Sequence, residues 1–164
     1  MPGRECRSPL KLVLDTNVVM DWLHFRDPGF EPIARAIADS PVELVSTTEC
    51  LEELRHVLAR PQFGLDEAAQ AAMCAAYAAR VRLWTVEDTA DEPAGDRPAL
   101  PRCRDADDQK FLVLAQQSGA DYLLTKDRAL LRLSAALSRR QCGFAVLTPE
   151  SFVVKVLQVS SARR

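Results

Sequence analysis

Short apolar runs alternate with longer amphipathic stretches along most of the chain. Runs rich in Val and Leu, such as residues 11–15 and 42–45, are bounded by turn residues and are typical of buried strands. Between these runs, apolar residues recur three or four positions apart, which is the spacing of a helix with one buried face. Strands that alternate with helices predict an α/β fold with a central, mainly parallel sheet flanked by helices. Further strands are predicted at residues 83–86, 121–125 and 144–147, and helices at residues 16–23, 33–37, 47–60, 66–79, 105–115, 128–137 and 149–157.

Residues 87–104 interrupt this alternation. Pro93, Pro98, Pro101 and Gly95 lie there among acidic residues, so we predict a long loop to which the sequence assigns no role.

The composition is that of one globular domain of ordinary size. The chain has 164 residues, of which 48% are hydrophobic, and this is enough for a buried core. We expect a flexible N-terminus at residues 1–10, a single domain at residues 11–158 and a flexible tail at residues 159–164. No segment approaches the roughly 18 apolar residues of a membrane span, and the N-terminus lacks an export signal. We therefore expect a cytoplasmic protein with no membrane partner.

Charge and cysteine content exclude several other classes. The formal net charge of −2 excludes a surface that is basic throughout, so a polyanionic partner would need a local basic patch. The five cysteines lie far apart, without a C-x-x-C pair, and two histidines do not complete a zinc site with them. We expect reduced thiols.

Acidic residues recur where predicted strands give way to helices. Asp15 follows the first strand, Glu53 lies in the helix after the second, Asp105 and Asp108 begin the helix after the long loop, and Asp127 follows the fourth strand. In a parallel sheet these strand ends share one edge, where ligands bind. Like charges repel by roughly 4 kcal/mol at about 4 Å and an effective dielectric constant near 20, so the cluster predicts a divalent cation. Oxygen ligands favour Mg²⁺ or Mn²⁺.

Such an ion beside a phosphodiester supports hydrolysis without a nucleophilic side chain. It polarises the phosphoryl oxygen and lowers the pKa of a bound water. The sequence has no G-x-S-x-G, P-loop or G-x-G-x-x-G motif that would indicate another chemistry. On a helix, Asp108 and Asp105 would lie on neighbouring faces while Asp107 points about 100° away from Asp108. Spacing does not decide whether Glu52 or Glu53 faces the crevice.

Five segments together resemble the PIN-domain nucleases, and more narrowly the toxins of bacterial toxin–antitoxin systems. The likeness extends over roughly residues 11–157 and is carried by residues 13–18, 46–58, 103–112, 120–127 and 147–152.

That resemblance implies a three-layer PIN-like fold and a metal-dependent ribonuclease that cleaves RNA. Matched position by position, the family's catalytic acids fall on Asp15, Glu53, Asp108 and Asp127. The additional carboxylates Asp105 and Asp107 depart from the family pattern and leave the third ligand position open, and Asp105 is the next candidate metal ligand. It also implies Mg²⁺ or Mn²⁺ as cofactor, a homodimer and, for toxin members, a cognate antitoxin protein that silences the enzyme.

Several of these side chains have an alternative explanation. Asp15, Asp105 and Asp127 are favoured types for the N-cap of the helix that follows each of them, and Glu53 could be a solvated helix residue. Glu49 has the spacing of a capping-box partner of Ser46. Ser46, Asn17 and Thr125 could orient the ligands or water, or make only cap and turn hydrogen bonds. Asp21, Asp27 and Asp39 are assigned to the solvated surface.

Basic residues flank the predicted site and could contact phosphates or be merely solvated. They are Arg55, Lys110, Lys126 and Arg128.

Two other classes of function remain as rivals. One is a receiver-like domain in which an Asp at a strand end accepts phosphate. The other is a non-catalytic RNA- or protein-binding module with the same fold.

Overall fold

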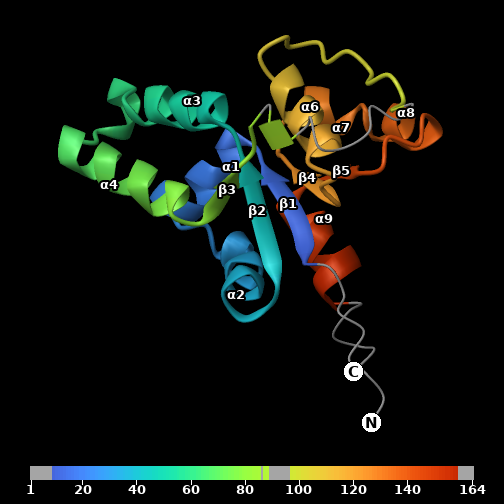
Figure 1. Cartoon of the computed structure of the whole chain (residues 1–164). Coiled ribbons are helices and arrows are strands. Elements are labelled where there is room, and N and C mark those ends of the chain that lie inside the picture. The colour runs from blue at the N-terminus through green and yellow to red at the C-terminus, as the bar shows by residue number, and fades with distance from the viewer. Residues whose placement is uncertain (1–8, 86, 89–96, 159–164) are drawn as a thin grey trace.

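Five parallel strands form one sheet in the order β3-β2-β1-β4-β5 in the computed structural model, which describes residues 9–85, 87–88 and 97–158 (Figure 1). Val13 of the central strand pairs with Val45 on one side and Leu123 on the other. The strands are β1 (Leu10–Leu14), β2 (Val42–Ser46), β3 (Val81–Leu83), β4 (Tyr122–Leu124) and β5 (Ala145–Leu147).

Eight α-helices and four 3₁₀- or π-helical segments with the bounds given below lie between the described strands or after the last of them. Segments η1 and η4 are π-helical and continue α1 and α9 without a break, whereas η2 and η3 are single 3₁₀ turns. The bounds are α1 (Thr16–Met20), η1 (Asp21–Phe25), η2 (Pro28–Phe30), α2 (Glu31–Asp39), α3 (Thr48–Leu58), η3 (Pro61–Phe63), α4 (Glu67–Ala78), α6 (Gln109–Gln117), α7 (Arg128–Leu131), α8 (Ser134–Arg139), α9 (Pro149–Phe152) and η4 (Val153–Gln158).

The sheet separates two hydrophobic cores because side chains alternate along β1. Val13 belongs to a core with Phe111 of α6 and Leu130 of α7. Leu12 and Leu14 belong to the other core, which receives side chains of α1, α2, α3, α4 and α9. In Figure 1 the α3 and α4 helices project beside β3, away from α6, α7 and α8. This three-layer arrangement, with a parallel sheet buried on both faces, confirms the predicted fold class.

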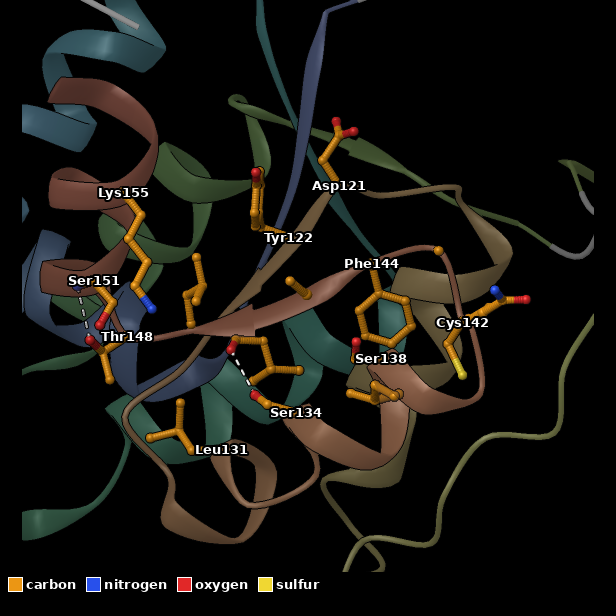
Figure 2. Close-up of a pocket in the computed structure, with 16 residues that line it drawn as sticks. Asp121, Tyr122, Leu131, Ser134, Ser138, Cys142, Phe144, Thr148, Ser151 and Lys155 are labelled. Atoms are coloured by element: carbon orange, nitrogen blue, oxygen red, sulfur yellow. Dashed lines mark hydrogen bonds between the residues drawn. The ribbon is translucent and has the colours of Figure 1, made fainter. Parts of the chain in front are cut away.

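Strand β5 lies at an edge of the sheet, where backbone groups without a partner can form hydrogen bonds with a strand of another chain. Ser134 at the start of α8 covers this edge by donating its hydroxyl to the carbonyl of Val146 at 3.0 Å (Figure 2). The Val146 carbonyl, which belongs to the middle residue of β5 and faces away from the sheet, is therefore already hydrogen-bonded to α8.

The predicted helix at residues 128–137 is two helices, because a turn at Arg132 and Leu133 separates α7 from α8. That turn brings Ser134 to the edge of β5. Strand β3 begins two residues before the predicted start and ends at Leu83, so Trp84 and Thr85 lie beyond it and the predicted bounds are wrong. Its partner β2 ends at Ser46, whose carbonyl accepts from the Trp84 N–H.

Helix α3 is capped one residue later than the predicted capping box. Thr47, not Ser46, is the N-cap, and its hydroxyl accepts from the Cys50 N–H at 3.2 Å. Ser46 is instead the buried last residue of β2, so Glu49 is not its capping-box partner.

Four other predictions concern features of the chain as a whole. The proposed terminal segments lie mostly outside the described residues, as do residues 89–96 of the predicted long loop. Within the described part of that loop, residues 97–104 form neither helix nor strand, whereas residues 87–88 are helical, so the loop prediction is wrong at those two positions. Cys50, Cys74, Cys103 and Cys142 are free thiols. Among the described residues, no helix has the length and apolar character to cross a membrane.

Candidate active site

Asp15 stands at the carboxyl end of the central strand, where its backbone N–H donates to the Leu124 carbonyl of β4 at 3.0 Å. It is the N-cap residue of α1 by position, yet its side chain makes no capping hydrogen bond. Its Oδ2 instead accepts from Thr125 Oγ1 at 2.6 Å and from Asn17 Nδ2 at 3.0 Å. The carboxylate is therefore held across the β1–β4 boundary, and the N-cap explanation for its side chain is wrong.

Burial is the main cause that raises the pKa of Asp15 above its ordinary value. The residue is only 4% exposed. The hydrogen bonds from Thr125 and from the Thr16 N–H act in the opposite direction, and the negative charges of Glu53 and Asp127 raise the pKa further. Asp15 thus faces other carboxylates rather than a fixed cation.

Glu53 lies in α3 and lines the same pocket as Asp15. Of the adjacent residues Glu52 and Glu53, it is therefore Glu53 that faces the site. Its Oε1 accepts from Thr16 Oγ1 at 2.6 Å, and its Oε2 forms an ion pair with Lys110. Glu52 is exposed. Because α1 and α6 both contact Glu53, this side chain is fixed from two elements and is not a freely solvated helix residue.

Asp127 follows β4 and both caps α7 and faces the same crevice. Its Oδ1 accepts from the Ala129 and Leu130 N–H groups at 2.5 and 3.4 Å. The predicted cap is therefore present, and it fixes the carboxylate. Among the described residues, none donates a hydrogen bond to Oδ2, which leaves that oxygen available to a ligand.

Asp108 precedes α6 and lies among the negative charges of the other acids. Burial and these charges raise its pKa from 3.8 to about 7. The charges that contribute after burial are, in order of size, those of Asp15, Asp105, Asp127 and Glu53.

The four acids matched to the PIN pattern therefore converge, although they come from β1, α3, α6 and α7. They line one pocket of about 400 Å³. Its other lining residues are Thr16, Asn17, Met20, Asp21, Phe25, Val57, Arg60, Phe63 and Lys126.

Asp105 does not begin a helix, because α6 starts only at Gln109. It lies in an exposed turn in which its Oδ1 accepts from the Asp107 N–H at 3.0 Å, so the predicted helical spacing of Asp105 and Asp108 is wrong. Asp105 and Asp107 line a neighbouring pocket of about 440 Å³, which Glu53 and Asp108 also border. Asp105 is thus adjacent to the four-acid pocket without lining it.

Three residues near the site make contacts that the sequence did not lead us to predict. Asp21 is buried and pairs with Lys126 Nζ at 2.7 Å, so its assignment to the solvated surface was wrong. Its spacing of four residues from Asn17, one helical turn, is a signal that could have found it. Thr16 holds Glu53, as described above. Gln109 fixes the turn before α6, since it accepts from the Cys103 N–H at 2.7 Å and donates to the Pro101 carbonyl at 3.2 Å.

The donor set fits a hard divalent cation in its chemistry. All four acids offer oxygen ligands, and their mutual repulsion is what a bound cation would relieve. Among the described residues, no three His, Cys, Asp or Glu side chains are already grouped so as to hold a metal ion.

A larger depression of about 640 Å³ lies beside the β5 edge, and Figure 2 shows Ser134, Cys142 and Lys155 around it. None of the five predicted acids lines it. Convergent polar groups, rather than size, identify the four-acid pocket as the candidate site.

A family model described as PIN domain matches residues 11–129, which include all but the first residue of β1 and all five predicted acids. The chain therefore belongs to the PIN-domain family, and its fold is of the nuclease type. The predicted resemblance to this family is confirmed. A comparison with curated proteins finds no match.

Proposed function

We propose that this protein is a metal-dependent endoribonuclease that hydrolyses RNA phosphodiester bonds. The observation that carries the proposal is the convergence of Asp15, Glu53, Asp108 and Asp127 on one pocket. Membership of the PIN-domain family supports the same chemistry, because PIN domains are generally nucleases.

Asp15, Asp108 and Asp127 would hold Mg²⁺ or Mn²⁺, with Glu53 assisting directly or through water. The ion, when bound, polarises a phosphoryl oxygen and lowers the pKa of a water. Thr125 and Asn17 fix Asp15, while the helix cap on Oδ1 orients Asp127 with its second oxygen free. Thr16 and Lys110 hold Glu53 from opposite oxygens. Asp105 is the next candidate ligand, at the border of the site.

Replacing Asp15 with Asn tests the proposal because it keeps the shape of the side chain and removes its charge. The measurement is the rate at which a fluorophore-labelled RNA is cleaved with Mg²⁺ or Mn²⁺. Loss of a residue that only supports a metal ligand typically lowers activity by roughly 10- to 100-fold, and we expect Asp15→Asn, which alters a ligand itself, to lower the rate by more than this. Circular dichroism should show an unchanged fold. Asp39→Asn is the matched control, since Asp39 is exposed in α2 and lies away from the four-acid pocket. A folded Asp15→Asn variant with full activity would falsify the central role.

The alternative of a non-catalytic binding module with this fold predicts a different outcome. Such a module should bind RNA or protein without cleaving RNA at any metal concentration. The receiver-like alternative is disfavoured by membership of the PIN-domain family.

The resemblance to the toxin branch extends the proposal to partners. On this basis the protein acts as a homodimer and is silenced by a cognate antitoxin protein. Light scattering on the purified chain tests the first statement, and growth arrest upon induction of wild type but not of Asp15→Asn tests the toxic activity.

A further inference from the structure

Two aromatic side chains form part of the wall of the four-acid pocket. Phe25 and Phe63 line it together with the carboxylates. Their ring centroids lie 6.0 Å apart at an interplanar angle of 70°. His24 contacts both rings edge to face, at 4.7 Å from Phe25 and 5.3 Å from Phe63. We call these three residues the aromatic wall.

The fold presents Phe25 at the end of a helical segment. Phe25 ends the π-helix η1, and the next residue, Arg26, adopts a left-handed conformation with φ of 51° that turns the chain away. Phe63 ends the 3₁₀ turn η3, nearly forty positions later in the sequence. Two separate segments thus meet at the pocket, so the wall is a tertiary feature rather than a local one.

Phe25 is exposed to an extent that is unusual for its size. It is 57% exposed, and the other large hydrophobic side chains with high exposure among the described residues are Leu83 and Val154. Neither of these aliphatic residues lines the four-acid pocket. Edge-to-face contacts with His24 and Phe63 support the Phe25 ring while more than half of its surface stays open.

Two cations line the same pocket. Arg60 is exposed and makes no ion pair with a described residue, and Lys126 is 43% exposed while paired with Asp21. A pocket with acids that suit a metal ion, cations that suit phosphates and an open aromatic ring has the chemistry of a site for a single-stranded nucleic acid. An aromatic ring stacks on any base whose face is free, whereas a base inside a duplex already stacks on its neighbours.

We propose that Phe25, supported by His24 and Phe63, stacks on an unpaired base of the RNA beside the phosphate that enters the four-acid pocket. This inference rests on the proposed nuclease function, and it adds the residue that selects unpaired segments. Arg60 contacts the backbone of the same strand.

The test measures binding separately from cleavage. In the full chain carrying Asp15→Asn, affinity for a single-stranded oligoribonucleotide with one 2-aminopurine is measured with Mg²⁺ present. Phe25→Ala should weaken binding about tenfold, which lies within the range for loss of one stacked base, and should abolish the quenching of 2-aminopurine fluorescence. Phe25→Leu keeps an apolar side chain without a π face and should behave like Phe25→Ala. Phe25→Trp should retain affinity and quenching.

Val154→Ala is the matched control, because Val154 is 56% exposed and lies in η4. It should bind as the parent does. A duplex of the same sequence should bind more weakly than the single strand to the parent and show no effect of Phe25→Ala. Melting temperatures of all variants should be alike, since the Phe25 ring is largely exposed.

Unchanged affinity and quenching in Phe25→Ala would overturn the inference. Weakening in Phe25→Ala but not in Phe25→Leu would overturn it too, because it would indicate an apolar contact such as a peptide side chain makes. Failure of the nuclease proposal has a different signature. If the wild type cleaves no RNA with Mg²⁺ or Mn²⁺ while Phe25 still governs single-strand binding, the proposed activity fails and the stacking site stands. If the parent binds no RNA, the stacking inference fails, whereas the nuclease proposal is still decided by whether the wild type cleaves RNA.

Discussion

Among the residues that the structure describes, Lys110 is the one basic residue that forms an ion pair with a proposed catalytic acid. Its ammonium group pairs with Glu53, and both side chains are largely buried, at 16% and 26% exposed. The negative charge of Glu53 raises the pKa of Lys110, while burial of the ammonium group acts against it. Lys110 thus neutralises the charge of Glu53, which a second metal ion would otherwise have to do.

Replacing Lys110 with Met should therefore make the site more dependent on metal. Without its partner, Glu53 is left as a partly buried acceptor, which should lower the free energy of unfolding in EDTA by about 1–3 kcal/mol. Mn²⁺ should restore more stability to this variant than to the wild type. Thermal melts in EDTA and in Mn²⁺ measure both effects. Lys155→Met, an exposed lysine in η4, should change neither, and equal Mn²⁺ shifts in Lys110→Met and wild type would contradict the role.

The raised pKa of Asp108 leads to a prediction of how the stability of the metal-free protein depends on pH. Burial and neighbouring acids raise its pKa from 3.8 to about 7 in the folded state. The folded chain therefore binds more protons than the unfolded chain between these values, so its stability falls as pH rises from about 4 to about 7. In EDTA, the melting temperature should decline across this interval in wild type and decline less in Asp108→Asn. Parallel curves for the two proteins would contradict the assigned repulsion.

Among the elements, the start of α6 decides where Asp108 lies. Gln109 ties this helix to the preceding loop through the Cys103 N–H and the Pro101 carbonyl. Gln116, at the other end of the same helix, donates to the Pro98 carbonyl at 2.7 Å. Two glutamines thus attach the same loop to α6, one beside the site and one distant from it.

This pair gives a matched test of loop attachment. Gln109→Ala should lower Mn²⁺ affinity by roughly tenfold, as loss of an outer partner of a ligand does, because the turn before Asp108 is released. Gln116→Ala should cost a similar free energy of unfolding, about 1 kcal/mol, and leave Mn²⁺ affinity unchanged. Isothermal titration and chemical denaturation measure the two quantities. Equal Mn²⁺ affinities in the two variants would show that the turn does not position Asp108.

Sequence periodicity predicted the elements well where local pattern decides them. Residues 12–14 are all apolar because this part of β1 is buried on both faces, and that pattern is visible in the sequence. The break between α7 and α8 was not predictable, since Leu130, Leu133 and Leu137 continue a helical spacing through it. Its reason is tertiary: Ser134 reaches the neighbouring edge strand. Asp105 was misplaced for the same kind of reason, because the contacts of Gln109 delay the start of α6.

At the scale of the whole molecule, the strand order explains why four distant acids meet. With β1 in the centre and β4 beside it, Asp15 and Asp127 follow adjacent strands at the same edge of the sheet. This convergence was predictable from a parallel sheet alone. The choice of Glu53 over Glu52, and the position of Asp105 at the border, depend on side-chain contacts that spacing does not encode.

Because the acids lie at the junction of β1, α3, α6 and α7, a bound ion should stabilise the entire domain. An ion that binds only the folded state at about 100 times its Kd adds roughly 2.7 kcal/mol to the free energy of unfolding. For a domain of this size that corresponds to a rise in melting temperature of about 5–10 °C. Calorimetry should show this rise on adding Mn²⁺ or Mg²⁺ and its loss on adding EDTA.

The controls for this experiment separate a specific site from a salt effect. KCl at equal ionic strength should not reproduce the rise, and Asp39→Asn should keep it because Asp39 lies in α2 away from the site. Asp15→Asn should melt at least as high as wild type in EDTA, since it removes a buried like charge, and should gain little from Mn²⁺. The opposite pattern, with identical melting temperatures in Mn²⁺ and EDTA for wild type, would mean that the four carboxylates do not bind an ion.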